Sequence, residues 1–468
     1  MINVLIVEDE PEYARILDKL IVNECYKIYA DNCESAIENI GSRFLDLIIL
    51  DLNIPLNNNP NSTISPNHGH TVFAYARDQS PGTPIIVLTG SSAEDFIGSL
   101  VDGNTKLDLW GNGQEMSMVA FHKKHNLDKF PILLNKYIHS LDKLSNIEIN
   151  KRNLSLTLEQ DRLIRIFALQ YNGVRVEIAQ VSGGLSSAKV FRLKLTNNSG
   201  DTIINSICKI GSNKTIKSEH ANYESFISRL KQDATPRKLA IIEHGAKDHA
   251  AVFYSLADGF IYNMFDKISS EQETTELVNR VESLLNSWNA TSENRVPIIN
   301  IRRLLLEDKD LELLKNIPEW ISEFESKEIQ VKMGCAHCDL HGFNILISDN
   351  NIPVLIDYGD VTFAPSCLDP ITLELCIHYH PESQYLNIGW PTIEQAKRWF
   401  DLDSYLINCP CPEYILACRG WTERTIAGKR ELAAGFYSYL IRQMKYSNTN
   451  KELTLAFMEG AKNLYDET

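Results

Sequence analysis

Acidic and hydroxyl side chains in the first part of the chain stand directly after short apolar runs. Glu8 and Asp9 follow the run VLIV, and Asp51 follows LIIL. Thr89 closes the run IIVL in the same way. Because parallel strands end at one edge of a sheet, we expect these side chains to gather at that edge. Clustered carboxylates form a hard, oxygen-rich site that suits Mg²⁺. One such residue would be unremarkable as a helix cap, but this ordered series favours a binding site.

A second group of chemically active residues lies in HCDLHGFN, which contains His337, Asp339 and Asn344. Two apolar runs joined by SDNN follow it and lead to Asp357 in IDYGD. This spacing indicates phosphoryl transfer. Asp339 would accept the proton of an attacking hydroxyl, while Asn344 and Asp357 would hold Mg²⁺ on nucleotide phosphates. We predict that His337 braces the loop by hydrogen bonding and that His341 lies near the acceptor.

Residues that would bind the nucleotide precede this motif in the order that such a site needs. The loop SGGLSSAKVF lies between two β-like runs, and its small residues would let backbone N–H groups approach phosphate oxygens. On its own, such a loop is more often a plain hairpin turn. Lys209 follows inside a strand-like run, where it would bind the α- and β-phosphates. The candidate phosphate-binding residues of the loop are Gly183, Gly184, Ser186 and Ser187.

The acidic partner of Lys209 is Glu219 or Glu224, which both lie in the helix-like stretch IKSEHANYESFI. Glu219 has Tyr223 and Phe226 at positions i+4 and i+7, on one helical face, whereas Glu224 aligns less well. We therefore choose Glu219 as the residue that orients the lysine.

Cysteines close to these motifs suggest zinc as an alternative. Cys335 and Cys338 flank His337, and CPC occupies 409–411. A structural zinc site normally needs two such pairs at a workable separation. Because His337 and His341 belong to the phosphotransfer motif, zinc there would occupy the surroundings of the base. We therefore expect these cysteines to be thiols.

The elements that would position the first group alternate along residues 1 to about 140. Continuous apolar runs between helical stretches indicate a parallel sheet that is covered on both faces. Two segments rich in Asn and Gly, 56–69 and 101–114, are interpreted as surface insertions. The expected strands are 4–9, 45–52 and 83–90, and the expected helices are 11–23, 70–78 and 127–142.

A different pattern begins at about residue 156. Runs at 176–195 and 202–211 indicate a twisted antiparallel sheet, and the apolar spacing beyond about 265 is mostly helical. The polar stretch 146–155 is interpreted as the joint between two units. The predicted domains are 1–142 and 156–468, with a linker at 143–155.

The first unit resembles the receiver domain of two-component response regulators through LIVEDEP and ILDLNIP. The resemblance implies a flavodoxin-like, doubly wound α/β fold with a five-stranded parallel sheet. It implies that Glu8 and Asp9 bind Mg²⁺ together with the backbone carbonyl of Asn53. Asp51 would also bind the metal and would accept a phosphoryl group from an upstream histidine kinase or phosphotransfer protein. Thr89 and a lysine would sense the resulting acyl phosphate.

The switch lysine is Lys123 or Lys124, which follow the apolar run MVAF. Asn126 at helix-cap spacing favours Lys123. Phe121, three residues before Lys124, matches the aromatic residue usual in the family and favours Lys124. We choose Lys123.

Residues 156–468 resemble the aminoglycoside/choline phosphotransferase branch of the protein-kinase-like fold. HxDLHxxN with a short return to IDYGD is typical of that branch, and FAPSCLDPITLEL is similar to its later aspartate segment, which implies that Asp369 is a structural carboxylate. The resemblance implies a bilobal α+β domain with an N-lobe at about 156–262 and a C-lobe at about 263–468. It also implies Mg²⁺, ATP or GTP as the donor, and an unidentified hydroxyl acceptor.

The composition disfavours several other classes of protein. The 468 residues include 46 basic and 61 acidic side chains, which gives a net charge of −15. That charge disfavours binding to DNA or to anionic lipid. Because the sequence has no apolar run of about 18 residues and no secretory pattern at its start, we expect a cytoplasmic protein without a membrane segment.

Together these features predict a phosphorelay signalling protein. Phosphorylation of Asp51 would regulate an ATP-dependent phosphotransferase that acts on a hydroxyl group. The alternative is a pseudo-kinase adaptor that binds nucleotide and docks a partner. Because degenerate domains usually lose a lysine, a base or a metal ligand, the presence of Lys209, Asp339, Asn344 and Asp357 favours the active enzyme.

Overall fold

A computed structural model describes most of the chain, and its contacts divide it into two compact units. Unit 1 contains residues 1–217 and 238–256, and unit 2 contains residues 218–237 and 257–468. The division differs from the predicted boundaries at 142 and 262. The described residues are 2–21, 25–90, 106–181, 188–227, 230, 235–256, 260–268, 271–288 and 292–468.

Unit 1 begins with a five-stranded sheet in which every pair of neighbouring strands is parallel. The strand order is β2-β1-β3-β6-β9. The first strand therefore lies inside the sheet, as in a doubly wound fold. This confirms the predicted fold class of the N-terminal part. The strands are β1 (Ile2–Val7), β2 (Cys25–Ala30), β3 (Leu47–Asp51), β6 (Ile85–Thr89) and β9 (Val119–Lys123).

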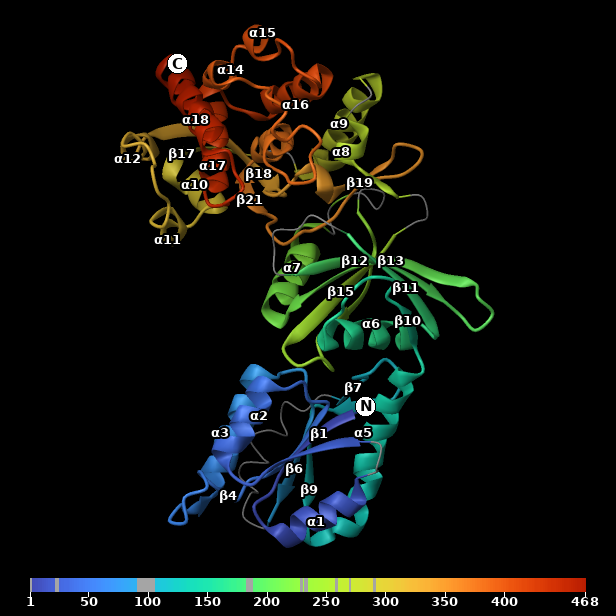
Figure 1. Cartoon of the computed structure of the whole chain (residues 1–468). Coiled ribbons are helices and arrows are strands. Elements are labelled where there is room, and N and C mark those ends of the chain that lie inside the picture. Colours follow the sequence, from blue (N-terminus) through green and yellow to red (C-terminus); the bar gives the residue numbers. More distant parts are fainter. Residues whose placement is uncertain are drawn as a thin grey trace. The chain divides into compact units, whose positions relative to one another are not determined.

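Helices cover both faces of this sheet, and successive residues of one strand enter different cores (Figure 1). Val4 and Ile6 belong to the core that includes residues of α1 and α5. Leu5 and Val7 belong to the core that includes residues of α2 and α3. This alternation explains why the strands are continuously apolar. The helices are α1 (Pro11–Leu20), α2 (Cys33–Ser42), α3 (Pro66–Gln79) and α5 (Phe130–Ser145).

The first predicted insertion is exposed over most of its length. It includes the end of a small hairpin of β4 (Ile54–Pro55) and β5 (Ile64–Ser65), after which α3 begins. Gly69, in the first turns of α3, is buried against the chain beside Asp51. A Cβ atom on Gly69 would lie 2.3 Å from the Cα atom of Leu52, so the helix approaches the strand end this closely only with glycine.

The prediction that 101–114 is a surface insertion is wrong for the centre of the segment. Residues 101–105 lie outside the described part of the chain, but Leu109 and Trp110 are 2% and 0% exposed. They lie between the short strands β7 (Lys106–Leu107) and β8 (Met116–Ser117). Gly111, at a φ of +70°, turns the backbone so that this apolar pair enters the core. The segment is therefore an interior packing element at its centre.

The second sheet of unit 1 has six strands, in the order β10-β11-β12-β13-β15-β14. The predicted joint contributes to it, because Glu148–Asn150 form β10 and pair with β11 in parallel. Helix α5 likewise continues to Ser145, so 143–155 is not an extended linker. The other elements are β11 (Arg175–Gln180), β12 (Lys189–Thr196), β13 (Thr202–Ser212), β14 (Lys238–Ile242), β15 (His249–Ser255) and α6 (Leu158–Gln170).

One apolar core joins the two sheets of unit 1. It contains Trp110 and Tyr137 from the first part and Phe167 and Phe253 from the second. The rings of Trp110 and Tyr137 meet edge to face at 5.9 Å, and those of Phe167 and Phe253 stack at 3.9 Å. The burial of aromatic side chains across this boundary makes unit 1 a single packed body.

Unit 2 is mainly helical, with two small three-stranded sheets. The chain enters it within α7 (Asn213–Ser225). The strands are β16 (Tyr262–Asn263), β17 (Ser292–Pro297), β18 (Glu328–Ala336), β19 (Ile345–Ile347), β20 (Pro353–Leu355) and β21 (Thr362–Pro365). The helices before β18 are α8 (Met264–Lys267), α9 (Glu271–Leu285), η3 (Asn286–Trp288), α10 (Ile298–Leu305), α11 (Asp308–Leu311) and α12 (Ile321–Glu325). The later helices are η4 (Gly342–Asn344), α13 (Leu368–Leu375), η5 (Cys376–His378), α14 (Ile393–Lys397), α15 (Leu402–Tyr405), α16 (Pro412–Thr425), α17 (Lys429–Gln443) and α18 (Lys451–Asp466).

Candidate functional site

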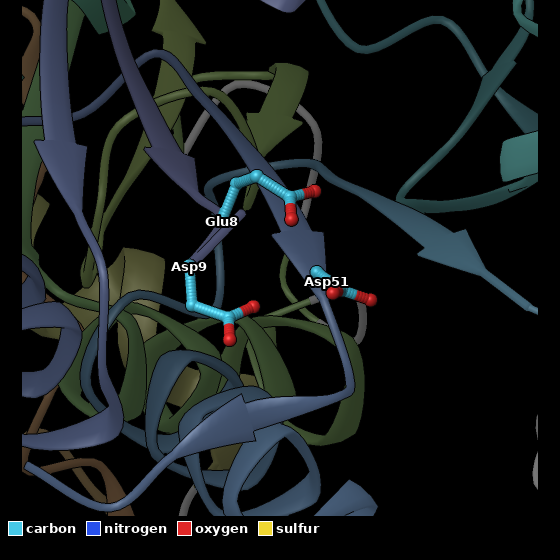
Figure 2. A group of neighbouring side chains, drawn as sticks. All are labelled: Glu8, Asp9 and Asp51. Carbon is cyan, nitrogen blue, oxygen red and sulfur yellow. The ribbon is translucent and has the colours of Figure 1, made fainter. Parts of the chain in front are cut away.

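The predicted carboxylates of the first group lie together at the carboxyl ends of β1 and β3. Glu8, Asp9 and Asp51 each place an oxygen within 4.8 Å of the others. Figure 2 shows the three side chains converging from the two strand ends. Asp51 is 1% exposed and Glu8 is 5% exposed, so the cluster is largely screened from solvent.

The lysine of this cluster is Lys124, and the prediction of Lys123 is wrong. Lys124 Nζ lies 2.7 Å from Asp51 Oδ2 and 2.8 Å from Glu8 Oε2. Lys123 ends β9 and is exposed. Successive side chains of a strand alternate in direction, so a shift of one residue moves an ammonium group from the cluster to solvent. The cap at Asn126 misled the prediction, because the α-helix begins only at Phe130.

The cluster carries more negative than positive charge. Burial raises the pKa of Glu8 to about 7, although the hydrogen bond from Lys124 opposes the shift. Burial also raises the pKa of Asp9 and of Asp51. The pKa of Lys124 is raised because its bonds to Asp51 and Glu8 outweigh its burial. One lysine does not neutralise these three carboxylates, two of which are buried, so the site favours an additional cation.

Magnesium fits this donor set. Glu8, Asp9 and Asp51 supply carboxylate oxygens, which are the hard ligands that Mg²⁺ prefers. The Asn53 backbone N–H donates to Asp51 Oδ1 at 3.3 Å, which places Asn53 beside this carboxylate. Its carbonyl role stays a prediction. Thr89 ends β6 beside β9, but its side chain lies outside the described residues.

In unit 2, the loop 337–344 follows β18 and is held by a buried carboxylate. Asp369 Oδ2 and Oδ1 accept the backbone N–H groups of His337 and Cys338, both at 2.9 Å. His337 Nε2 lies 3.1 Å from the carbonyl oxygen of Ile356. These contacts confirm that Asp369 is structural and that His337 braces the loop. They involve two residues of the cluster that suggested zinc, because His337 and Cys338 bond through their backbone N–H groups and His337 also through Nε2.

Asn344 and Asp357 are brought together by the hairpin between them. Ile345 pairs with Leu355 in this hairpin, as the two apolar runs predicted. Asn344 Nδ2 donates to the backbone carbonyl of Asp339 at 2.9 Å, so the amide oxygen is the atom of this side chain that could bind a metal. Asp357 has a φ of +65° and is half-buried. Oxygen donors of this kind fit Mg²⁺.

Asp339 is surrounded by cationic and imidazole groups. Arg442 Nη2 lies 3.0 Å from Asp339 Oδ1, and His341 Nε2 lies 3.7 Å from Oδ2. Burial alone would raise the pKa of Asp339, but Arg442, His341 and His337 lower it to about 2. Burial lowers the pKa of His341, against the opposing charges of Asp339 and Asp357. The carboxylate is therefore ionised beside a neutral imidazole at ordinary pH.

Arg442 was missed by sequence reasoning. It lies in α17, whose aromatic and aliphatic residues predict only a core helix. A basic residue in the last turn of a helix is also explained by the helix dipole, so its type and position gave no distinguishing signal.

The nucleotide-binding predictions are placed only in part. Glu219 is 1% exposed and Glu224 is exposed, which agrees with the choice of Glu219. Three residues after Glu219, Asn222 Nδ2 donates to the carbonyl oxygens of Tyr358 and Gly359 at 3.2 and 2.9 Å. This helix therefore contacts the segment directly after Asp357.

Lys209 is 5% exposed in β13, where it is paired with Val190 and Val252. The predicted phosphate loop cannot be placed in the same way. Its candidate residues, Gly183, Gly184, Ser186 and Ser187, lie outside the described part of the chain.

Comparison with known proteins assigns the first sheet. Residues 4–105 match the family model of the response regulator receiver domain. This part of the chain is a receiver domain. It is 33% identical over 105 residues to the autoinducer 1 sensor kinase/phosphatase LuxN of Vibrio campbellii, a match that covers 21% of this chain. The chain spans 11% of the length of that curated relative.

Solved structures are similar to both parts of the chain. The receiver domain of the sensor histidine kinase PA1611 from Pseudomonas aeruginosa, which holds a magnesium ion in its active site cleft, is 15% identical. That match covers 29% of this chain and 97% of the other, with a TM-score of 0.22. An aminoglycoside-3'-phosphotransferase of type VIII is 14% identical and covers 62% of this chain and all of its own, with a TM-score of 0.39.

Across the described part of the chain, every helix is too short or too polar to span a bilayer.

Proposed function

We propose that this chain is a phosphorelay protein in which the receiver domain controls a Mg²⁺- and ATP-dependent phosphotransferase. Asp51 accepts a phosphoryl group from an upstream histidine kinase or phosphotransfer protein. The second part of the chain transfers the γ-phosphoryl group of ATP, or of GTP, to a hydroxyl acceptor. The observation that carries the proposal is that Asn344 contacts the backbone of Asp339 and that the hairpin returns the chain to Asn344 at Ile356, the residue before Asp357.

In the receiver domain, Asp51 is the proposed nucleophile, because Lys124 contacts both Asp51 and Glu8 and Asp51 is the one that ends β3 in the motif ILDLNIP. Lys124 stabilises negative charge on the transferred group, and Glu8 and Asp9 complete the oxygen donor set. Magnesium, when bound there, neutralises the charge that builds on the phosphoryl oxygens. Thr89 is the predicted residue that responds to the acyl phosphate.

In the loop 337–344, Asp339 accepts the proton of the acceptor hydroxyl. Its neighbour His341 contacts the side of the carboxylate that Arg442 leaves open. Asn344 and Asp357 hold the metal on the nucleotide, and magnesium there supplies charge neutralisation at the phosphates. Lys209, with Glu219 as its orienting acid, is proposed as the phosphate-binding lysine on sequence order.

Control by the receiver is supported by backbone contacts inside unit 1. Gly82, just before β6, donates its N–H to the carbonyl of Lys247 at 2.6 Å and accepts the N–H of Gly245 at 2.8 Å. Gly245 and Lys247 lie in the turn that leads into β15, and β15 pairs with β13 at Val252 and Lys209. The receiver sheet is therefore connected through main-chain hydrogen bonds to the strand that carries the lysine.

A buried ion pair reinforces the same boundary. Arg162, in α6, lies 2.6 Å from Asp46, just before β3, and the Asp46 side chain is 1% exposed. Because a buried carboxylate without its partner is costly, the contact resists separation of the two sheets. A change at the receiver site is thus expected to reach β13 and β15 without loss of this interface.

The proposal is tested by Mg²⁺-dependent ATP turnover of the full chain, with and without beryllium trifluoride as a phosphoryl mimic at Asp51. The mimic should change the turnover rate of the wild-type protein and should leave Asp51→Asn unaffected. Because the variant keeps the transferase site, it controls for any action of the mimic on bound nucleotide. Equal responses of the two proteins would remove the regulatory claim.

A further inference from the structure

Arg442 lies in the last turn of α17 and reaches the loop that carries Asp339. Its Nη2 atom is 3.0 Å from Asp339 Oδ1 and 3.7 Å from Asp360 Oδ2. Its Nη1 atom donates to the carbonyl oxygen of Cys338 at 3.2 Å. The side chain is only 15% exposed, and both of its terminal nitrogens contact the loop.

The helix that carries Arg442 is fixed to the preceding strand at its other end. Glu431, in the first turn of α17, accepts the backbone N–H of Lys332 in β18 at 3.2 and 3.3 Å. Glu431 is 1% exposed. Strand β18 runs directly into the loop, so α17 is attached to the strand at one end and to the loop at the other. Such an arrangement holds a side chain in one place more firmly than a loop would.

The peptide before Asp339 is held from both sides. Cys338 has a φ of +60°, a conformation that is uncommon outside glycine. Its N–H donates to Asp369 Oδ1, and its carbonyl accepts from Arg442. The direction in which Asp339 leaves the backbone is therefore set by Asp369 on one side and by Arg442 on the other.

We propose that Arg442 is a positioning residue of the transfer reaction, which holds Asp339 through Oδ1 and directs Oδ2 to the acceptor hydroxyl. This inference rests on the proposed function, because it gives Asp339 a role as base. A guanidinium suits the task, since its planar fork contacts the carboxylate and the adjacent carbonyl together, whereas an ammonium is a single point of attachment.

Two other roles would leave different kinetic signatures. If Arg442 only stabilised the fold, its loss would lower the fraction of folded protein and leave kcat per folded molecule unchanged. If it blocked Asp339 as a latch, its loss would raise kcat. A positioning residue instead lowers kcat and leaves the KM for ATP nearly unchanged, because Arg442 contacts Asp339, Cys338 and Asp360 and none of these is proposed to bind the nucleotide.

The test compares full-length Arg442→Gln, Arg442→Lys and Lys445→Gln in Mg²⁺-dependent turnover of ATP with water as acceptor. Lys445 is the matched control, because it lies three residues further on and pairs with Asp310 at 2.8 Å. Thermal unfolding of each protein gives the folded fraction. Arg442→Gln should lower kcat about 10- to 100-fold with little change in KM. Arg442→Lys should recover part of the loss, and Lys445→Gln should match wild type.

A double mutant decides whether Arg442 acts through Asp339. In an Asp339→Asn background, Arg442→Gln should cause no further fall in kcat. An equal fall in both backgrounds, a wild-type kcat in Arg442→Gln, or a rise in kcat would each overturn the role of Arg442 and leave the proposed function intact. Absence of turnover in the folded wild-type protein would instead overturn the proposed function, and the role of Arg442 with it.

Discussion

The carboxylates of the receiver cluster lie beside Lys124, and Asp339, the carboxylate of the loop 337–344, lies beside Arg442, yet their pKa values move in opposite directions. Burial raises the pKa of Glu8 to about 7 in the receiver cluster, despite Lys124. In the loop, Arg442 and two histidines outweigh burial and lower the pKa of Asp339 to about 2. Burial acts on both sites, so the balance of local charges decides whether the pKa of a carboxylate rises or falls.

This difference separates two tasks. A cluster with excess negative charge attracts a divalent cation, which suits a carboxylate that is proposed to accept a phosphoryl group. A carboxylate whose negative charge is balanced by a neighbouring arginine stays ionised and keeps one orientation, which suits a base. In the proposed function, the receiver carboxylate Asp51 accepts a phosphoryl group, whereas Asp339 accepts a proton.

The largest expected effect is at Asp339. Its replacement by Asn removes the proton acceptor and keeps the shape of the side chain, so ATP-dependent transfer should fall about 10²- to 10⁴-fold. Nucleotide binding, measured by calorimetry, should persist. Asp360→Asn is the matched control, because Asp360 lies only 3.7 Å from the same arginine and has no assigned chemistry. Equal losses in the two variants would show that charge around Arg442, and not a base, is what matters.

The receiver site offers an internal control in two adjacent lysines. Lys124→Ala removes the ammonium that contacts Asp51 and should slow phosphorylation by a small-molecule phosphodonor about 100-fold. Lys123→Ala removes an exposed side chain and should leave the rate unchanged. The rate is followed by incorporation of labelled phosphate into the full chain. The reverse pattern would contradict the assignment of Lys124.

The boundary between the two sheets is tested by a pair of glycines. Gly245 has a φ of +86°, and a Cβ atom there would lie 2.7 Å from Ile166. Gly200 has a φ of +87° but open space around it. Gly245→Ala should therefore lower the free energy of unfolding by about 2 to 3 kcal/mol, and Gly200→Ala by about 1 kcal/mol. Equal losses in denaturant unfolding would mean that the boundary is loosely packed.

The smallest effect concerns the buried carboxylate of Glu431. The hydrogen bonds that the structure describes for it come from the backbone N–H groups of Lys332 and Ala427. Burial raises its pKa from 4.5 to about 7. The folded state then binds more protons than the unfolded state between these values, so this group makes the protein less stable as pH rises from about 4.5 to 7. Glu431→Gln should flatten that part of the stability curve, measured by urea unfolding. An unchanged slope would place the titration elsewhere.

Much of the receiver domain could be predicted because its strands are buried on both faces. Val4 to Val7 form a continuous apolar run, and the acidic residues that follow must lie at the strand end. The same logic failed at β9, the last strand of this sheet along the chain, where Lys123 ends the strand and Lys124 is the next residue. The direction of a side chain at a strand end depends on the residue at which the strand ends, and the local sequence predicts that residue poorly.

The remaining errors arose where tertiary packing overrides composition. Trp110 is flanked by Gly and Asn residues that are typical of a surface loop, but α6 and α5 provide the core that receives it. Glu148–Asn150 is polar because β10 is an edge strand, although it pairs in the sheet. Arg442 is distant in sequence from Asp339, and only the packing of α17 along β18 brings the two together.

The central claim is that the chain passes a phosphoryl group from ATP to a hydroxyl acceptor through Asp339. The direct measurement is the transfer of label from γ-labelled ATP by the purified full chain into a cell extract. The account predicts a labelled hydroxyl ester that requires Asp339 and still forms with Asp51→Asn. Label confined to Asp51 in the wild-type protein, with none in the extract, would contradict it.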